Sequence, residues 1–247
     1  MSELMTLEKI EESKIYQRNG VTFRHPLEVA SPFLKAFGEQ DLYIQTDKDV
    51  VNVNDDGSKN ISYGRVLIQK VFGQNEVNTT VGMIIAFDNL QVKLFAGAQV
   101  SACTNLCIFN STWLINTKIT SRLDSHIDYM HNLVAGTGDL NWNRTIEEMV
   151  LSKLHRDAVH KLHSQFILEH RKTKDKALYG ESFTNKAFAD ILMEDSKSPY
   201  VMQGEFTSEW NVYNALTQQI SDSKDILYAP SKSLEAYEMI KALTIAN

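Results

Sequence analysis

Polar and apolar residues alternate along residues 49–72, DVVNVNDDGSKNISYGRVLIQKVF, on both sides of Asp56-Gly57. A period of two is typical of β-strands, and an Asp-Gly step favours a hairpin because glycine accepts the positive φ that tight turns need. Residues 76–110 continue with two further apolar runs, which we expect to meet at a turn near Asp88-Asn89. The pattern predicts an antiparallel meander of about four strands between residues 50 and 110.

The period changes in the second half of the chain, where apolar residues recur every three or four positions. Residues 121–136 are predicted to form one helix that ends at Gly136, with a face made of Leu123, Ile127, Met130 and Val134. The clearest helix is predicted over 145–172, with an apolar stripe of Leu151, Leu154, Ala158, Leu162 and Phe166. We expect shorter helices over 185–195 and 208–220, and a last one that opens at Ser231 after Pro230.

The N-terminal 48 residues are predicted to form short helices. Ser31, Pro32 and Gly38 supply a cap, a first-turn proline and a stop for one of them. Because strands come first and helices follow, the fold class is α+β rather than a parallel α/β fold. We expect a single domain over 1–247, with a helical N-terminal segment (1–48), the β meander (49–118) and a helical part (119–247).

Composition places the chain among ordinary folded proteins, with 43% hydrophobic and 23% charged residues. The start, MSELMTLEKIEESK, lacks the apolar core of a signal peptide. No run of about 18 apolar residues is present, as a membrane-spanning helix would require. We therefore expect a cytoplasmic protein with no membrane segment, whose two cysteines are reduced.

The net charge of −6 gives the whole molecule no attraction for DNA or RNA, so any nucleic-acid contact must come from a local patch. One candidate patch lies between residues 153 and 176, where seven basic residues stand against three acids. The candidate nucleic-acid contacts in this segment are Lys153, Arg156, Lys161, Arg171, Lys172 and Lys174. The alternative interpretation is a solvated helix face.

A second group of candidate contacts lies on the predicted strands, where basic and aromatic residues are interleaved. Single strands bind by stacking their bases on aromatic rings beside cationic grooves. One strand carries Tyr63, Arg65, Lys70 and Phe72, and another carries Lys93 and Phe95. These residues would line a groove if one face of the sheet were exposed, and burial of the rings in the core is the alternative.

Cys103 and Cys107 are the two cysteines of the chain. On one continuous strand they would lie about 13 Å apart, which is too far for a shared metal ion or a disulfide. A turn at Thr104-Asn105 would bring them together, but a structural zinc site needs two more ligands. We expect both thiols in the core of the sheet, because free cysteine is among the most buried residue types.

Signatures of catalysis are missing from the sequence. No serine occurs in a G-x-S-x-G elbow, and neither phosphate-loop glycine pattern occurs. His160 and His163 are spaced to contact one ion, but the glutamate of the H-E-x-x-H pattern is missing. We therefore predict no catalytic residues, no metal and no cofactor, and expect a protein that is not an enzyme.

Two separated segments carry recognisable signatures. Residues 82–109 contain V-x-x-C-x-N as Val100, Cys103 and Asn105, and residues 209–221 contain W-x-x-Y-N-A-x-T as Trp210, Tyr213, Asn214, Ala215 and Thr217. Together they resemble a domain-of-unknown-function family common in bacteriophage and plasmid genomes, over roughly residues 60 to 220. The serine and histidine that usually follow the first Asn of that family are replaced here by Leu90 and Gln91.

The resemblance implies an origin on a phage or another mobile element, and so a place in the cytoplasm of an infected bacterium. It supplies no reaction. The first hypothesis is a non-enzymatic nucleic-acid-binding protein of phage DNA metabolism and recombination, which binds single-stranded DNA and assembles as a homo-oligomer, including the single-strand annealing type. The alternative is an anti-defence or host-takeover protein that binds a bacterial host protein. A hydrolase with an acidic metal site that the sequence does not reveal is a third hypothesis.

Overall fold

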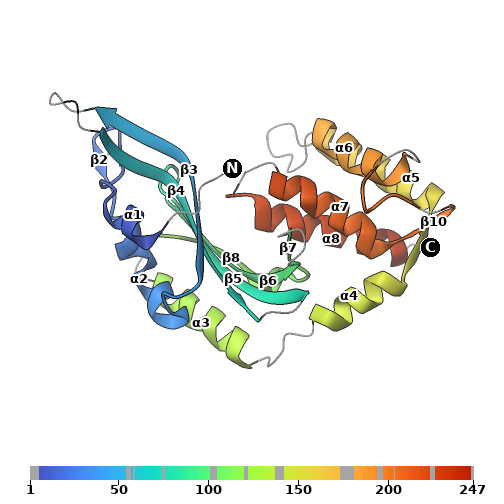
Figure 1. Cartoon of the computed structure of the whole chain (residues 1–247), viewed down its shortest axis with the longest axis horizontal. Coiled ribbons are helices and arrows are strands. Elements are labelled where there is room, and N and C mark those ends of the chain that lie inside the picture. Colours follow the sequence, from blue (N-terminus) through green and yellow to red (C-terminus); the bar gives the residue numbers. More distant parts are fainter. Residues whose placement is uncertain are drawn as a thin grey trace. The chain divides into compact units, whose positions relative to one another are not determined.

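The computed structural model confirms an α+β fold with an antiparallel sheet and a helical C-terminal part (Figure 1). It describes residues 6–53, 57, 59–73, 76–100, 105–119, 122–136, 142–172, 181–193, 197–202, 204–222 and 226–245. The chain divides into two compact units. Unit 1 contains residues 1–74, 78–97 and 111–140, and unit 2 contains residues 75–77, 98–110 and 141–247. Residues 119–140 therefore belong with most of the strands, although their helical period assigned them to the helical part.

The main sheet has the order β3-β4-β5-β6-β7, and β8 also pairs with β6. Its strands are β3 (Leu42–Val53), β4 (Lys59–Phe72), β5 (Val77–Ala86), β6 (Gln91–Val100), β7 (Asn105–Cys107) and β8 (Leu114–Lys118). The predicted meander is confirmed, but β3 begins at Leu42 rather than near residue 50. The extra residues form a strand because Leu42–Asp47 pair in register with Lys70–Arg65 of β4.

Two turns of the meander lie where they were predicted. Gly57 stands between β3 and β4 with φ +80°, a conformation that glycine adopts without steric cost. Asp56, the other residue of that predicted turn, lies outside the described residues. The β5–β6 connection contains Asp88 and Asn89, as expected, and Leu90 takes the positive φ of 58°.

Close packing of β5 on β6 requires a glycine at position 82. A β-carbon placed on Gly82 would lie 2.1 Å from Cζ of Phe95, far inside van der Waals contact. Since Gln69 pairs with Gly82, the side chains of Gln69 and Phe95 lie on the same face of the sheet. We call this face the Phe95 face, and the alternation of side chains along each strand assigns every other residue to it or to its opposite.

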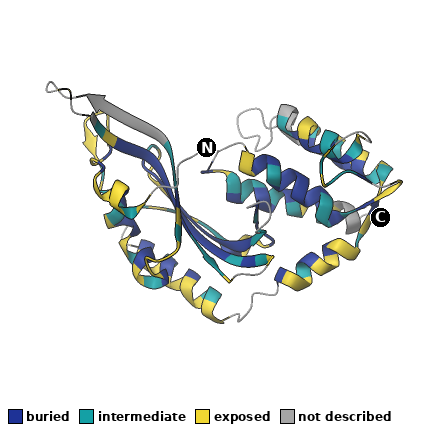
Figure 2. Ribbon diagram, in the orientation of Figure 1, coloured by how far each residue is buried: buried dark blue, intermediate teal, exposed yellow. Residues whose placement is uncertain are grey.

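Unit 1 builds its core on the face opposite to Phe95. Val66 and Ile68 of β4 and Met83 and Ile85 of β5 are fully buried there. Helix α2 (Pro26–Phe37) contacts β4, and helix α3 (Leu123–Gly136) contacts α2 and β8. Figure 2 shows the buried sheet and the exposed outer sides of these helices. The N-terminal elements of the unit are α1 (Leu7–Glu11), β1 (Gln17–Arg18) and β2 (Val21–Thr22), and the short 3₁₀ helix η1 (Ser111–Trp113) precedes β8.

The predicted helix start at Ser31 is wrong, because α2 begins five residues earlier. Pro26 occupies the first turn, and Nδ1 of His25 accepts a hydrogen bond from the amide of Leu27, so His25 is the N-cap. Proline fits the first turn since its missing N–H has no partner there. Pro32 lies inside the helix. Gly38 ends the helix with φ +82°, as predicted.

Unit 2 contains α4 (Trp142–Leu151), β9 (Lys153–His155), α5 (Arg156–Lys172), α6 (Glu181–Leu192), β10 (Phe206–Ser208), α7 (Glu209–Asp222) and α8 (Ala229–Ile245). Helices α7 and α8 pack against each other and against β7. The helices predicted after residue 180 are confirmed, although α8 starts at Ala229 and so includes Pro230 in its first turn. None of the helices in the described ranges is both long and apolar enough to span a bilayer.

The single long helix predicted over 145–172 is wrong. The chain leaves the helix at Ser152, whose carbonyl accepts from the amide of Glu209, and Lys153–His155 then pair with Phe206–Ser208. Glu209 is completely buried, with Ser152 Oγ 2.8 Å from Oε1 and Lys241 Nζ 2.7 Å from Oε2. The apolar stripe is interrupted accordingly, because Leu151 is 79% exposed whereas Leu154 is buried.

The second of the two apolar runs predicted over residues 76–110 forms two strands rather than one. Strand β6 ends at Val100, and β7 begins at Asn105 and runs antiparallel to it, with Val100 opposite Asn105. Cys107 lies on β7 opposite Ala98 and is fully buried as a free thiol, as predicted. Cys103 lies outside the described residues.

Candidate nucleic-acid interface

Helix α5 has one buried and one exposed side along its described length. The buried side consists of Val159, Leu162 and Phe166. The exposed side carries Asp157, His160, Lys161, Ser164 and Leu168. Positions 171 and 172, an Arg and a Lys, are the last two residues of the helix.

Among the predicted basic residues with a described side chain, Lys161 is the one that lies on the exposed side of α5. We use the name basic face of α5 for Lys161 together with the Arg and Lys that stand in the sequence at positions 171 and 172, where the helix ends. Asp157 is the acid among the exposed side chains that the structure describes on this helix. The side chains of Arg171 and Lys172 and the whole of Lys174 lie outside what the structure describes.

Arg156 has a structural position rather than a place on the basic face of α5. Its guanidinium donates to the carbonyl of Leu192, 3.4 Å away, and to that of Gly204, 3.3 Å away. Leu192 is the last residue of α6, whose terminal carbonyls lack partners within the helix. Arg156 thus joins the start of α5 to the end of α6 and to the turn before β10.

Strands β9 and β10 form a two-stranded ribbon next to α5. Leu154 and Thr207 are directly opposite each other and buried. Alternation places Lys153, His155 and Phe206 on the outer face, and all three are exposed. The rings of His155 and Phe206 are 5.3 Å apart between centroids and nearly perpendicular, at 78°. An exposed aromatic pair next to Lys153 is an arrangement that suits base stacking.

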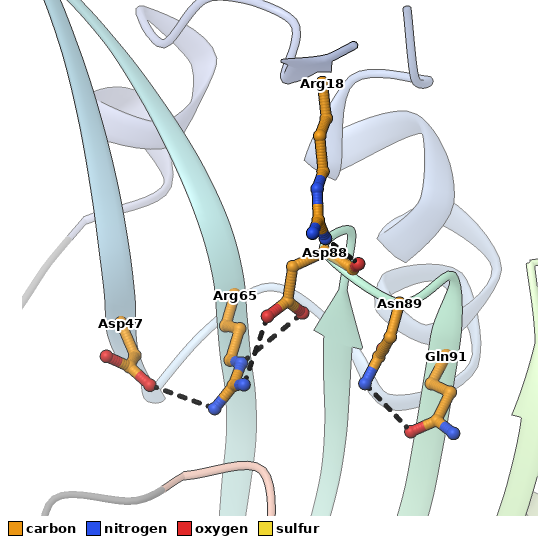
Figure 3. Close-up of polar contacts among 6 residues, drawn as sticks. All are labelled: Arg18, Asp47, Arg65, Asp88, Asn89 and Gln91. Atoms are coloured by element: carbon orange, nitrogen blue, oxygen red, sulfur yellow. Dashed lines mark hydrogen bonds and ion pairs between the residues drawn. The ribbon is translucent and has the colours of Figure 1, made fainter. Parts of the chain in front are cut away.

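Arg65 on β4 has two carboxylate partners and is almost completely buried. Nη1 lies 3.3 Å from Asp47 Oδ2 and Nη2 lies 3.1 Å from Asp88 Oδ2, with side-chain exposures of 10% for Arg65, 32% for Asp47 and 13% for Asp88. Arg18 donates to the backbone carbonyl of Asp88 from the opposite direction (Figure 3). Figure 3 also shows Asn89 and Gln91 paired with each other and not with Arg65. The charge of Arg65 is neutralised within unit 1, so this side chain does not join the proposed interface.

The predicted groove of bases and rings on the sheet is not brought together. Lys93 is two residues from Phe95, and Arg65 is four residues from Gln69, so both side chains lie on the Phe95 face. Lys70 and Phe72 are one and three residues from Gln69, so their side chains lie on the opposite face. Nζ of Lys70 is 5.7 Å from the centroid of the Phe72 ring. Lys93 is buried. These residues therefore stabilise the sheet of unit 1 and offer no continuous cationic surface.

The signature residues of the described part converge inside unit 2. Nδ2 of Asn105 on β7 donates to the backbone carbonyl of Asn214 on α7 at 3.3 Å, and Thr217 Oγ1 donates to the same carbonyl. All three side chains are buried. Val100, at the end of β6, is opposite Asn105, and Trp210 packs at 6.1 Å from the ring of Tyr213.

Tyr213 shows why such a signature can have a structural origin. Its hydroxyl accepts from the amide of Ile108 at 2.9 Å, donates to the carbonyl of the same residue, and lies 2.7 Å from Ser233 Oγ. Tyr213 and Ser233 are both fully buried, and Ser233 Oγ also donates to the carbonyl of Leu106. This network satisfies the edge of β7 with side chains from α7 and α8, which fixes the strand on the two helices.

The described residues contain no arrangement of side chains suited to a metal ion. No group of three or more histidine, cysteine, aspartate or glutamate side chains in those ranges could hold one. His163 does not converge with His160 on an ion: its ring stacks on Phe188 at 4.8 Å, and Nε2 lies 2.8 Å from Asn185 Oδ1.

Comparisons with known proteins found no relative of this chain. No protein-family model matches it, and the searches of curated proteins and of solved structures returned no match. The resemblance to a phage and plasmid family thus stays a prediction that depends on the residues quoted for it.

Sequence reasoning missed the two outward rings of the ribbon, Phe206 and His155. Phe206 stands in EFTSEW, which has neither a strand period long enough to detect nor a neighbouring cluster of bases. Its exposure follows from the pairing of β10 with a strand about 50 residues away in sequence, which no local pattern contains. The signal that was available was the basic segment itself, which begins at Lys153, two residues before His155.

Proposed function

We propose that this protein binds single-stranded nucleic acid, with DNA as the first candidate, through the basic face of α5 and the adjacent ribbon. The observation that supports the proposal is the register of α5. Lys161 lies on the exposed side, Val159, Leu162 and Phe166 occupy the buried side, and two further bases stand in sequence at positions 171 and 172, which end the helix. Several bases on one helix attract a phosphate backbone better than charges scattered over the surface would.

Because the whole chain carries more acidic than basic residues, nucleic-acid binding depends on where these cations lie. With a net charge of −6, binding must depend on a few local contacts and must weaken steeply as salt is added. As part of the same proposal, the protein acts without catalysis in the DNA metabolism of a phage or another mobile element, including strand annealing as a homo-oligomer.

The test is the affinity for a fluorescein-labelled oligothymidine, measured by fluorescence anisotropy as the salt concentration is raised. The double variant Arg171→Glu/Lys172→Glu should weaken binding by at least tenfold at low salt. It should also reduce the slope of log K against log salt by about 0.7 for each phosphate that the variant no longer neutralises. Duplex DNA and RNA of matched length are measured in parallel.

Lys35→Glu/Lys118→Glu is the matched control. It makes the same change in net charge at two exposed lysines of unit 1. Equal loss of affinity in both double variants would show that total charge, not the basic face of α5, governs binding. Absence of binding to single strands, duplex and RNA at low salt would refute the proposal itself.

A second candidate function, binding of a bacterial host protein, is favoured by one observation. Val150 and Leu151 at the end of α4 are 47% and 79% exposed, next to the ribbon. Adjacent exposed apolar side chains mark a candidate protein-interaction site when they belong to a larger patch. Leu151→Asp should abolish capture of the partner from a host lysate, whereas Tyr129→Asp on the exposed side of α3 should not. Equal capture by wild type and Leu151→Asp would exclude this surface.

A further inference from the structure

The outer face of the β9–β10 ribbon holds two aromatic rings in a fixed arrangement. Phe206 is 53% exposed, and its ring meets that of His155 edge to face. Nδ1 of His155 accepts a hydrogen bond from the amide of Asp157 at 3.2 Å, and Nε2 lies 3.6 Å from Glu205 Oε2. The hydrogen bond at Nδ1 orients the imidazole, and the edge-to-face contact places the Phe206 ring beside it.

The ribbon under these rings is anchored at both ends. The amide of Arg156 donates to the carbonyl of Glu205 at 2.9 Å, and the amide of Glu209 donates to the carbonyl of Ser152 at 3.0 Å. The inner face is buried through Leu154 and Thr207. An exposed ring on such a support loses little conformational entropy when a ligand covers it, which is the condition for a preorganised binding site.

We propose that the free face of Phe206 is a stacking platform for one unpaired base of a nucleic-acid strand. This inference rests on the proposed function and adds the contact that selects single strands. In a duplex both faces of each base are covered by its neighbours, so a lone ring on a narrow ribbon cannot reach one without unstacking the helix.

The charges around the rings agree with stacking as the main interaction at this face. Lys153 on the same face supplies a cation, but Glu205 and Asp157 lie next to His155 and repel phosphate. The ribbon therefore contributes through the base, and the basic face of α5 contributes through the backbone of the same strand. This division of roles predicts that variants at the two places respond differently to salt and to removal of the bases.

The experiment compares Phe206→Leu and Phe206→Trp with Tyr129→Leu, which removes an aromatic ring of similar exposure from unit 1. Affinities are measured for oligothymidine and for an abasic oligonucleotide of the same length and charge. Phe206→Leu should weaken oligothymidine binding by about 5- to 150-fold, because one base–aromatic stack contributes in that range. Its effect on the abasic strand should vanish. Phe206→Trp should bind like wild type and show quenched fluorescence with oligothymidine but not with the abasic strand.

The possible outcomes separate this inference from the proposed function. If Phe206→Leu binds oligothymidine like wild type while Arg171→Glu/Lys172→Glu does not, the stacking platform is refuted and the proposed function stands. An equal loss on the abasic strand would also refute stacking, since no base is present there. If the wild-type protein binds no strand, both ideas fail. An unchanged slope against salt for Phe206→Leu, with a reduced affinity, would support the platform.

Discussion

Arg65 is the residue whose replacement should destabilise unit 1 most among its charged side chains. Its guanidinium contacts Asp88 through two nitrogens, at 3.1 and 3.5 Å, and Asp47 through a third at 3.3 Å. Arg65→Met fills most of the same volume but removes the guanidinium from both carboxylates. Removing one partner of a buried ion pair costs about 3–5 kcal/mol, because the remaining charge stays desolvated.

The free-energy cost at each of the two carboxylates depends on how far that carboxylate is exposed to water. Asp88 is 13% exposed and keeps almost the full penalty, whereas Asp47 is 32% exposed and water can solvate it. We therefore expect Arg65→Met to cost about 3 kcal/mol, at the lower end of the range. Asp47→Asn should cost about 1 kcal/mol or less, as for partly exposed pairs, and Asp88→Asn should fall between the two. Arg65→Lys keeps the positive charge but loses the planar guanidinium that donates to both carboxylates, so its loss of stability should also be intermediate.

The assay is urea unfolding followed by the fluorescence of Trp113, the tryptophan of unit 1, with Trp142→Phe and Trp210→Phe in the background. This background matters because a chain with two compact units can unfold in two steps. The midpoint should shift with little change in slope, and the shift should persist at high salt because buried pairs are weakly screened. If Arg65→Met lies within about 0.5 kcal/mol of the background protein, or if Asp47→Asn costs more than Asp88→Asn, the argument from burial is wrong.

Three further predictions concern packing, hydrogen bonding and pH. Gly82→Ala should destabilise unit 1 by about 1–3 kcal/mol, because its β-carbon would overlap the ring of Phe95, and Phe95→Leu in the same chain should recover part of the loss in a double-mutant cycle of urea midpoints. Tyr213→Phe should cost about 0.5–1.5 kcal/mol in unit 2, since the amide of Ile108 loses the tyrosine hydroxyl but keeps Ser233 Oγ as an acceptor at 3.0 Å; a thermal midpoint equal to wild type would contradict this. Burial raises the pKa of Tyr237 above its ordinary value of 10.0, and Glu148 and Glu209 raise it further while Lys241 lowers it. A raised tyrosine pKa stabilises the fold below pH 10 and loses that contribution as pH rises through the folded-state pKa, so stability should fall above pH 10 in wild type and fall less in Tyr237→Phe.

The strands and most helices were predictable because their residues carry local information. The alternation along β4, the glycine at position 57 and the face of Leu123, Ile127 and Met130 in α3 all follow from spacing within a few residues. Gly38 ends α2 as predicted for the same reason, since a positive φ is a property of one residue. By contrast, the start of α2 at Pro26 was missed because two prolines compete for the first turn, and His25 accepts the capping hydrogen bond.

The candidate interface was predictable only as a segment. The excess of bases after Lys153 indicated the region, in which Lys161 is exposed on α5, and its contact with nucleic acid stays a prediction. The sequence did not reveal that Arg156 is committed to the carbonyls of Leu192 and Gly204, or that Arg65 is paired with Asp88. The number of charged residues can be read from a sequence. Whether a charged side chain can bind a ligand depends on the carboxylates and carbonyls that the fold places beside it.

Local patterns in the chain are enough to show which residues alternate, which recur every three or four positions, and where a glycine permits a turn. They are enough because hydrogen-bonding geometry and side-chain size act over a few residues. The break of the helical pattern at Ser152 needs long-range pairing instead, since it depends on Glu209 and on a strand about 50 residues away. The same pairing leaves the ring of Phe206 on the outer face of the ribbon, where burial of Leu154 and Thr207 holds it toward solvent.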